Sequence, residues 1–288
     1  IGAIFILGVI FVKETMARTL LIFLVLALST YDLFRFGTKF TPFTPREYYF
    51  PQTSVIEFLQ KDKNIFRVAT NDPRIFPPNF STYYKIQSIE GYDPLYLLSY
   101  AELIAASERA DHSIHRPFGF NRIITPHNIN SPIIDLLNVK YILSLSDLTS
   151  DRFSKVFQEG QTRVYENKAY LERAFFVREV VRAEDSESTI QQMFANDLRS
   201  TGVVAGYQIV QTNFRTGTAR ILEYSENKVL IETENDGDGF LILTDSYYPT
   251  WKAKIDGKGA KIYKTNQAFR GIHVPSGKHS IKFYNSLL

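Results

Sequence analysis

The clearest feature of the hydrophobic pattern is a pair of apolar stretches at the beginning of the chain. Residues 1–12 carry no charged side chain, and a second stretch runs from Thr19 through an aromatic segment to Phe36. These 18 residues are just long enough to cross the hydrocarbon core of a bilayer, which needs about 20. The pattern predicts a membrane hairpin, in which residues 1–12 end a first, truncated transmembrane helix and residues 18–36 form a second, so that residues 1–36 are membrane-embedded.

The charges around these stretches predict their orientation. Lys13 and Arg18 lie in the short segment between them, and short basic loops stay on the cytoplasmic side. The chain after Gly37 is therefore expected outside the cytoplasm. A secretory signal beginning at Met16 is the alternative, with a basic start followed by an apolar centre. The apolar run before Lys13 favours the hairpin, and both interpretations export the rest of the chain.

Beyond the membrane segment, the pattern indicates a linker and a mixed α/β domain. Residues 37–53 are rich in Pro, Thr and aromatic residues and lack a helical period, which predicts a linker. Helical spacing of apolar residues predicts helices at 54–62, 95–107, 133–137 and 185–197, the first capped by Ser54 with Glu57 three residues later. Apolar β-runs predict strands at 65–70, 139–145, 162–167 and 173–183, and residues 70–94 should be mostly irregular. Helices and strands alternate over 54–205, which is typical of a mixed α/β domain.

From residue 206 onward the pattern changes to short β-runs separated by turns. The runs recur every eight to twelve residues or so, beginning with 207–212 and ending with 279–285. This spacing predicts an antiparallel β-sandwich of seven or eight strands over residues 206–288. The expected fold class is a membrane-anchored α+β protein: a transmembrane hairpin, a mixed α/β extracytoplasmic domain and a C-terminal sandwich.

Composition narrows the classes of function. Lys and Arg number 33 against 30 Asp and Glu, and a net charge of +3 gives no footprint for nucleic acid, which is not an expected partner. The absence of cysteine excludes disulfides, thiolate zinc sites and a thiol nucleophile. The sequence contains no nucleotide-binding glycine loop, no G-x-S-x-G, no H-E-x-x-H and no EF-hand. No motif of the sequence indicates a cofactor, and we expect none.

Two short segments resemble metal sites without a full set of ligands. Asp111, His112 and His115 have helical spacing, but Arg109 and the Arg116-Pro117 pair add positive charge and a helix break. Solvent-facing loop histidines are the favoured interpretation. The acidic residues of "ENDGDGF", Asp236 and Asp238, are better explained by a hairpin turn than by calcium. No metal is expected.

The segment "DSYYPTWKAKIDGK", residues 245–258, holds the only tryptophan and two adjacent tyrosines. Such a cluster could contact a glycan or fill a core, and Tyr247, Tyr248 and Trp251 are the candidate glycan contacts. Trp251 alternates with Lys252 and Lys254, which favours a strand with the tryptophan on its buried face. The two tyrosines then lie at a corner before the strand, and an Asp256-Gly257 turn ends it.

Several motifs in fixed order resemble a known family. They are "GYDPLY" (91–96), "LLNVKYIL" (136–143), "VYEN" (164–167), "RAFFV" (173–177), "LTDSYYPTWKAKIDGK" (243–258) and "NQAFRGIHVPSGKHSIKFYN" (266–285). In this order they are similar to the C-terminal extracytoplasmic region of YfhO-like bacterial membrane proteins. The helix that ends in "DLFRFG" (32–37) fits the same family.

The resemblance implies a multi-pass cell-membrane protein of the type that transfers sugars from lipid carriers to cell-envelope glycopolymers. Its expected partners are the bilayer, a polyprenyl-phosphate-linked sugar and an envelope glycan. In such enzymes the acidic catalytic residue lies in an early outside loop, to which no part of this chain corresponds. The chain would then be the C-terminal portion of a glycosyltransferase, not catalytic alone, and we therefore assign no catalytic residue. Asp93 of "GYDP" is the carboxylate most worth testing near the membrane site, although a helix cap before Pro94 is the favoured interpretation.

Two functions of different classes remain open at the level of sequence. In the first, the exported part positions an acceptor glycan for the glycosyltransferase. In the second, it is a structural or interaction module of the cell envelope that makes no sugar contact. A sugar site requires aromatic faces with hydrogen-bonding side chains nearby, whereas an interaction module presents an apolar patch without them.

Overall fold

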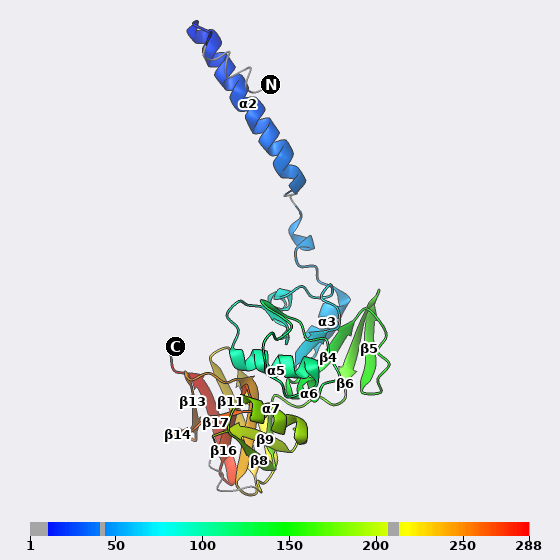
Figure 1. Cartoon of the computed structure of the whole chain (residues 1–288), viewed down its shortest axis with the longest axis vertical. Coiled ribbons are helices and arrows are strands. Elements are labelled where there is room, and N and C mark those ends of the chain that lie inside the picture. The colour runs from blue at the N-terminus through cyan, green and yellow to red at the C-terminus, as the bar shows by residue number, and fades with distance from the viewer. Residues whose placement is uncertain (1–10, 41–43, 207–212, 288) are drawn as a thin grey trace. The chain divides into compact units, whose positions relative to one another are not determined.

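The computed structural model describes residues 11–40, 44–206 and 213–287, and its contacts divide the chain into two units, residues 1–52 and 53–288 (Figure 1). The main element of the first unit is helix α2, Thr15–Phe40, which has no buried residue. With a mean hydropathy of 1.7 in its most apolar window, it is the one helix among the described residues that is long and apolar enough to cross a membrane. The helix predicted at 18–36 is thus confirmed as a helix, whereas residues 1–10 of the predicted first helix lie outside the described residues.

Helix α2 runs four residues past its predicted end, into the segment predicted as a linker. The rings of Phe36 and Phe40 contact each other at 4.5 Å between centroids, and Thr38 Oγ1 donates a hydrogen bond to the carbonyl of Arg35. Contacts at spacings of three and four residues stabilise another helical turn. A short 3₁₀ helix follows at Arg46–Tyr48.

The second unit begins with a helix packed on a four-stranded sheet. The sheet has the order β1 (Arg67–Thr70), β4 (Val139–Ser144), β6 (Thr162–Asn167), β5 (Phe153–Glu159), and only the β1–β4 pair is parallel. Helix α3, Ser54–Lys61, lies against it through Phe58, whose ring stacks on Phe157 at 4.9 Å. The predicted cap is wrong by one residue: Thr53, not Ser54, accepts the N–H of Ile56.

Four further helices belong to this unit, and all but the first agree with their predicted positions to within a few residues, whereas no helix was predicted at the first. They are α4 (Phe80–Tyr83), α5 (Leu98–Arg109), α6 (Pro132–Leu136) and α7 (Ser186–Ala195), and the last is capped by Asp185. Residues 70–94 are largely irregular as predicted, apart from α4 and the strand β2 (Gly91–Tyr92), which pairs with β3 (Ile123–Ile124). Helix α5 begins three residues later than predicted because Asp93 accepts the N–H of Leu95 in a turn that precedes it.

Two larger sheets contain the remaining strands. One has the order β7 (Ala174–Val177), β12 (Gly239–Ser246), β16 (Phe269–Val274), β15 (Tyr263–Thr265), β9 (Thr201–Ala205), β8 (Glu179–Ala183). The other has the order β10 (Gly217–Tyr224), β11 (Lys228–Asn235), β17 (Gly277–Asn285), β13 (Trp251–Ile255), β14 (Lys258–Ala260).

These sheets differ from the predicted sandwich in two respects. Strands β7, β8 and β9 of the six-stranded sheet come from before residue 206, and the β8–β9 pair is parallel. A parallel pair needs a crossover connection, and α7 supplies it between these strands. The strand predicted at 207–212 lies outside the described residues. The mixed α+β class is confirmed.

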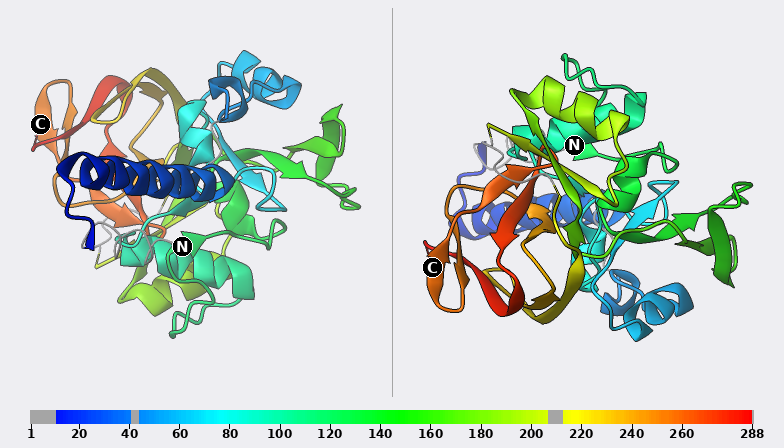
Figure 2. Two further views of the ribbon diagram at one scale, coloured as in Figure 1. Left: turned by 90° about the horizontal axis from the view of Figure 1, so that it is seen from above. Right: turned by 90° about the horizontal axis from the view of Figure 1, so that it is seen from below.

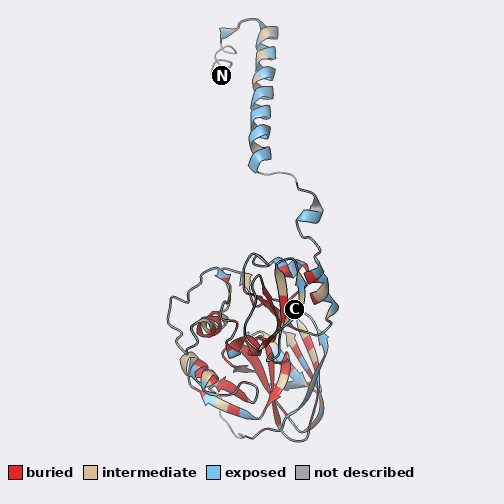
Figure 3. Ribbon diagram, turned by 90° about the vertical axis from the view of Figure 1, so that its right-hand side faces the viewer, coloured by how far each residue is buried: buried red, intermediate tan, exposed pale blue. Residues whose placement is uncertain are grey.

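The six-stranded sheet lies between two apolar clusters, as alternate residues of its central strand β12 show. Leu241 and Leu243 belong to a cluster shared with the five-stranded sheet, so these two sheets pack face to face. Phe240 and Ile242 point the other way, into a cluster that includes residues of α5, α6 and α7, and Figure 2 shows these helices grouped on that side. Figure 3 shows the buried residues concentrated in the sheets and on inward helix faces.

Both clusters join residues from before and after position 205. Ala174 and Phe176 pack with β11 and β17, while Phe269 packs with residues of α5 and α6. The predicted division of residues 54–288 into two domains at position 205 stays a prediction. The sheets nevertheless bring strand ends from distant parts of the sequence to a common place.

Candidate functional site

A cleft in the second unit lies where several of these strand ends meet. Its larger cavity has a volume of about 820 Å³ and a smaller one about 320 Å³. The two share four lining residues, Arg67, Ser88, Glu90 and Ser246, so they adjoin. Most of the side chains that line the larger cavity can form hydrogen bonds. The indole ring of Trp251 is one of these side chains.

The strands place charged side chains at the inner wall of this cleft. Arg67 begins β1, and Arg173 directly precedes β7. Asp245 lies in an irregularity of β12, where Leu243 faces Arg270 but Ser246 faces the preceding residue of β16. Two residues of β12 therefore have no opposite partner, which bends the strand locally.

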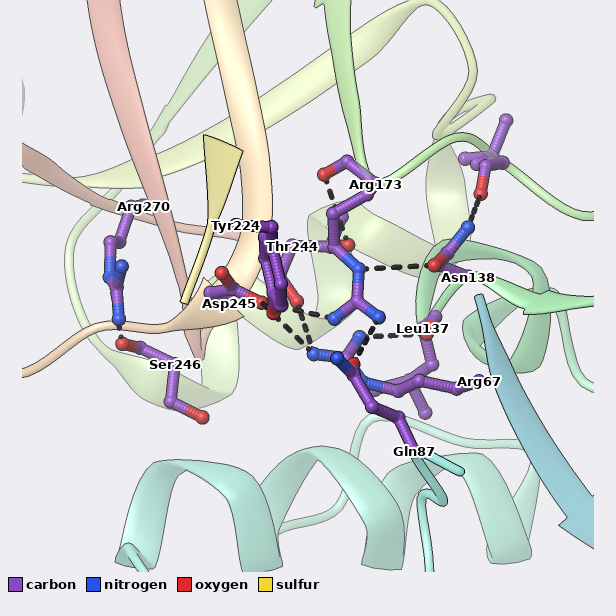
Figure 4. A network of polar contacts seen from close by, with 11 residues as sticks. Arg67, Gln87, Leu137, Asn138, Arg173, Tyr224, Thr244, Asp245, Ser246 and Arg270 are labelled. Atoms are coloured by element: carbon purple, nitrogen blue, oxygen red, sulfur yellow. Dashed lines mark hydrogen bonds and ion pairs between the residues drawn. The ribbon is translucent and has the colours of Figure 1, made fainter. Parts of the chain in front are cut away.

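Asp245 is the centre of a polar network (Figure 4). Its Oδ1 accepts hydrogen bonds from Arg173 Nη1 at 3.0 Å, Arg67 Nη2 at 3.2 Å and the hydroxyl of Tyr224 at 2.9 Å. The carboxylate side chain is only 12% exposed. One carboxylate thus serves two guanidinium groups, which makes the cluster positive before any other residue is counted.

Arg173 is the most enclosed of these residues. Besides its bond to Asp245, its Nε donates to Asn138 Oδ1 at 3.0 Å and its Nη2 donates to Gln87 Oε1 at 2.5 Å. Burial lowers the pKa of Arg173 to about 10, so the group keeps its charge at neutral pH. Every nitrogen of the guanidinium has a partner, so we assign Arg173 to the support of the cleft.

Arg270 is also buried, but its guanidinium has fewer hydrogen-bond partners than that of Arg173. It is 4% exposed, and its Nε donates to the carbonyl of Ser246 at 3.0 Å. Its Nη1 is enclosed and has no hydrogen-bond partner, and within residues 53–206 and 213–287 no carboxylate lies within ion-pair distance of it. Burial lowers the pKa of Arg270 to about 10, and Asp245 opposes that effect from a distance.

Trp251 covers one face of this arginine. The guanidinium carbon of Arg270 lies 3.5 Å from the centroid of the Trp251 ring. The ring is half-buried and packs at the border of the cluster between the two larger sheets. Its strand alternates as predicted, with Ala253 buried and Lys252 and Lys254 exposed. Trp251 is therefore both part of the core and part of the cleft wall.

Glu90 is the one acidic residue among the four that line both cavities. Its carboxylate accepts hydrogen bonds from the backbone N–H and, at 2.9 Å, from the hydroxyl of Thr70. Burial raises the pKa of Glu90 to about 7, against the effect of these bonds. A carboxyl group that titrates near neutral pH can exchange a proton there, a property often found in functional clefts.

The other predicted site residues lie around the cleft. Tyr247 and Tyr248 form the corner between β12 and β13, where the N–H of Tyr247 donates to the carbonyl of Ala268 at 2.7 Å. Tyr248 is 48% exposed, and neither tyrosine is among the residues that line the two cavities. Asp93 lines the smaller cavity and is exposed. It does not cap α5 as expected, because that helix begins at Leu98.

The two metal-like segments are not brought together. Asp111 Oδ1 accepts a hydrogen bond from the N–H of Ser113. Asp238 Oδ2 lies 3.7 Å from Nε2 of His273. Within the described residues, no three His, Asp or Glu side chains form a group that could hold a metal ion.

Sequence reasoning missed the charged cluster itself. Arg67 and Arg270 each stand in a largely apolar β-run, in "IFRVAT" and "AFRGIHV", and Asp245 lies at the end of the apolar run in "GFLILTDS". A single charge within a buried strand is costly unless it is paired or used, and that was the available signal. What the sequence could not supply was their proximity, since Arg67 and Asp245 are separated by 178 positions.

A comparison with protein families gives a match over the C-terminal part of the chain. Residues 204–285 match a family model described as "Bacterial membrane protein YfhO". The matched segment contains strands β10 to β17, including Asp245, Trp251 and Arg270. No curated protein and no solved structure matches the chain. The predicted resemblance is thus confirmed for residues 204–285.

Proposed function

We propose that the chain, whose residues 204–285 match the family model "Bacterial membrane protein YfhO", is the extracytoplasmic portion of a glycosyltransferase-like protein and holds an envelope glycan in its cleft. Helix α2 anchors this portion in the cell membrane, with the residues after position 37 outside the cytoplasm. The whole protein is multi-pass, and its catalytic residues lie in a part to which this chain does not correspond. The sugar donor is a polyprenyl-phosphate-linked sugar.

The observation that carries the glycan proposal is the composition of the cleft. Its larger cavity combines the Trp251 ring with hydroxyl, amide, carboxylate and guanidinium groups. Sugars bind to such combinations because their C–H faces pack on aromatic rings while their hydroxyls exchange hydrogen bonds with polar side chains. A volume of about 820 Å³ also falls within the range of pockets that hold small ligands.

The wall of the cleft is also well suited to hold its shape. Arg67 donates to the carbonyls of Leu137 and Thr244 at 2.8 and 2.9 Å, and thereby ties β1 to β12. Buried hydrogen-bond networks in which most donors are satisfied are rigid. A glycan that binds there meets preformed donors and loses little affinity to their ordering.

An interaction module is the second candidate, and a separate surface favours it. Tyr92 and Ile123 are opposite each other on β2 and β3, and they are 43% exposed each. Leu95, in the turn that follows, is 86% exposed, and Leu98 at the start of α5 is 50% exposed. Exposed apolar residues grouped in this way are typical of contacts with a protein or membrane surface.

Glycan-array binding by the 288-residue chain separates these two functions. The chain should be kept in a polyoxyethylene detergent, which carries neither sugar nor phosphate. Trp251→Ala should lower glycan binding by about tenfold or more, since aromatic stacking contributes on the order of 1 to 2 kcal/mol. Trp251→Phe keeps a ring and should retain part of the binding, and Tyr248→Ala tests whether the glycan reaches the corner.

Tyr92→Ala is the matched control, because it removes an exposed aromatic side chain from the apolar surface and not from the cleft. Glycan binding that is lost in Trp251→Ala and kept in Tyr92→Ala supports the proposal. No glycan binding by the unmodified chain, or equal binding by all variants, contradicts it and leaves the interaction module.

A further inference from the structure

Arg270 is a buried cation without a counterion among the described residues. Arg270 is 4% exposed, and among the residues that the structure describes it has no ion pair and no hydrogen bond from either Nη nitrogen. A desolvated charge is costly when it is unpaired. Proteins retain such groups where a ligand supplies the missing charge, and Arg270 lines the larger cavity.

The neighbouring carboxylate does not meet this need. All three donors that bind Asp245 converge on Oδ1, and they come from Arg67, Arg173 and Tyr224. Asp245 is therefore already shared by two guanidinium groups, while Arg270 bonds the carbonyl of Ser246, which carries no charge. One negative charge lies among three buried or half-buried arginines.

The remaining charges of the larger cavity leave this imbalance in place. Its lining contains the acidic and basic residues Arg67, Lys85, Glu90, Glu226, Asp245 and Arg270. Lys85 and Glu226 are both exposed, so solvent screens their effect. Glu90 binds Thr70 with both oxygens and is not directed to Arg270 by any hydrogen bond.

The geometry around Arg270 leaves the edge of the guanidinium as the place for a ligand. Trp251 covers a face at 3.5 Å, and Ser246 takes the hydrogen of Nε. Nη1 is enclosed, so a ligand in the cleft reaches Arg270 through Nη2, whose N–H groups can form charge-assisted hydrogen bonds with the oxygens of phosphate or carboxylate. The neighbouring Gly271 allows β16 to lie close to the Phe240 ring, since a Cβ at that position would lie 2.6 Å from it.

We propose that Arg270 and Trp251 form an oxyanion subsite of the cleft, which binds a phosphate or carboxylate group carried by the glycan. This inference rests on the proposed glycan-binding function and adds the chemical class of the ligand, an acidic glycan. Arg270 binds the anion directly, Arg67 and Lys85 add positive potential, and Trp251 packs on the sugar next to the charged group.

Fluorescence of Trp251 tests this subsite, because the chain contains one tryptophan and it contacts Arg270. The 288-residue chain in polyoxyethylene detergent is titrated with inorganic phosphate, glucose 1-phosphate, glucuronate and glucose, with chloride at equal ionic strength as the reference. The proposal expects a saturable change with glucose 1-phosphate or glucuronate that chloride and glucose do not produce. The stronger of the two distinguishes a phosphate from a carboxylate ligand.

Two variants assign the effect to the subsite. Arg270→Gln keeps a donor for Ser246 but removes the charge, and should weaken anion binding by about tenfold or more. Arg220→Gln removes the same charge from an exposed position on β10 and should change the affinity by less than about twofold. A folded Arg270→Gln chain that binds anions as the unmodified chain does overturns the proposal.

A second measurement needs no variant. Phosphate or glucose 1-phosphate should raise the Tm of the unmodified chain above its value in chloride of equal ionic strength, since a ligand of the folded state stabilises it. Equal Tm values in all salts count against the subsite. Binding of neutral oligosaccharides without any anion response would uphold the proposed function and overturn this inference. Anion binding without glycan binding would uphold the subsite and overturn the proposed function.

Discussion

Arg270 lies with its guanidinium carbon 3.5 Å from the centroid of the Trp251 ring, so the one tryptophan of the chain is stacked on a buried cation that has no ion pair among the described residues. The two residues come from strands β16 and β13, which belong to different sheets. Their contact therefore depends on the packing of the sheets and reports on it. Arg270 thereby differs from Arg173, whose guanidinium has a hydrogen-bond partner for each of its nitrogens.

The difference in hydrogen bonding between Arg173 and Arg270 predicts that the same substitution will destabilise the chain much more at Arg173 than at Arg270. Arg173→Met should lower the free energy of unfolding by roughly 3 kcal/mol, because Asn138 and Gln87 lose a donor and Asp245 loses a counterion. Arg270→Met should change it by less than about 1 kcal/mol, since removal of an unpaired buried charge offsets the lost contact with Trp251. Chemical denaturation of both variants in the same detergent measures these values. Equal losses would show that Arg270 is structural.

Glu90 predicts a specific pH dependence. Burial raises its pKa from 4.5 to about 7, so the folded chain binds a proton more tightly than the unfolded chain does. The contribution of Glu90 to stability is complete below pH 4.5 and is lost as the pH rises to about 7. Because the side chain borders an open cleft, the loss should be about 1 to 2 kcal/mol after allowance for solvent screening.

The substitution Glu90→Gln isolates this effect, because an amide can exchange hydrogen bonds with the same Thr70 groups and does not titrate. Its free energy of unfolding, relative to that of the unmodified chain, should increase between pH 4.5 and 7 and then stay constant. Denaturation curves at several pH values measure the difference. A difference that is independent of pH contradicts the raised pKa.

Asn138 predicts a contrast between alanine and glycine. Its φ of 61° is in the left-handed region, and its side chain joins the carbonyl of Leu171 at 2.8 Å to Arg173 Nε at 3.0 Å. Both substitutions lose these bonds, but glycine adopts this φ without strain. Asn138→Ala should therefore be less stable than Asn138→Gly by about 1 kcal/mol. Equal stabilities would show that backbone strain plays no part at this position.

The absence of cysteine makes the proposed topology accessible to labelling. Single cysteines can replace Lys13, before α2, and Lys258, at an exposed position of β14. A membrane-impermeant maleimide added to intact protoplasts should label Lys258→Cys and leave Lys13→Cys unlabelled until the cells are opened, as the positive-inside rule predicts. The reverse pattern would place the cleft in the cytoplasm and contradict the proposed function.

Local patterns accounted for much of the fold. Helices α3, α6 and α7 and most strands after residue 213 were predictable because a period of 3.6 or 2 residues and a turn at each end define them. The Asp256-Gly257 turn is a further example: φ values of 50° and 81° join Ile255 to Lys258 in a two-residue hairpin. Such features depend on neighbours in the sequence alone.

The membership of the sheets could not be predicted in the same way. Strand β7 pairs with β12 over a separation of more than 60 residues, and β8 pairs with β9 in parallel through α7. The hydrophobic pattern of a strand shows which face is buried but not which strand lies beside it. Trp251 illustrates this limit, since its inward face was predictable and its contact with Arg270 was not.

The central claim is that the cleft holds an acidic glycan against Arg270 and Trp251, and NMR of the single indole N–H tests it most directly. A ¹⁵N-labelled chain should show one indole cross-peak, because it contains one tryptophan. Addition of an acidic oligosaccharide should shift this peak in a saturable way, and Arg270→Gln should abolish the shift while Arg220→Gln retains it. A peak that stays in place at saturating oligosaccharide, or that shifts equally in both variants, would contradict the account.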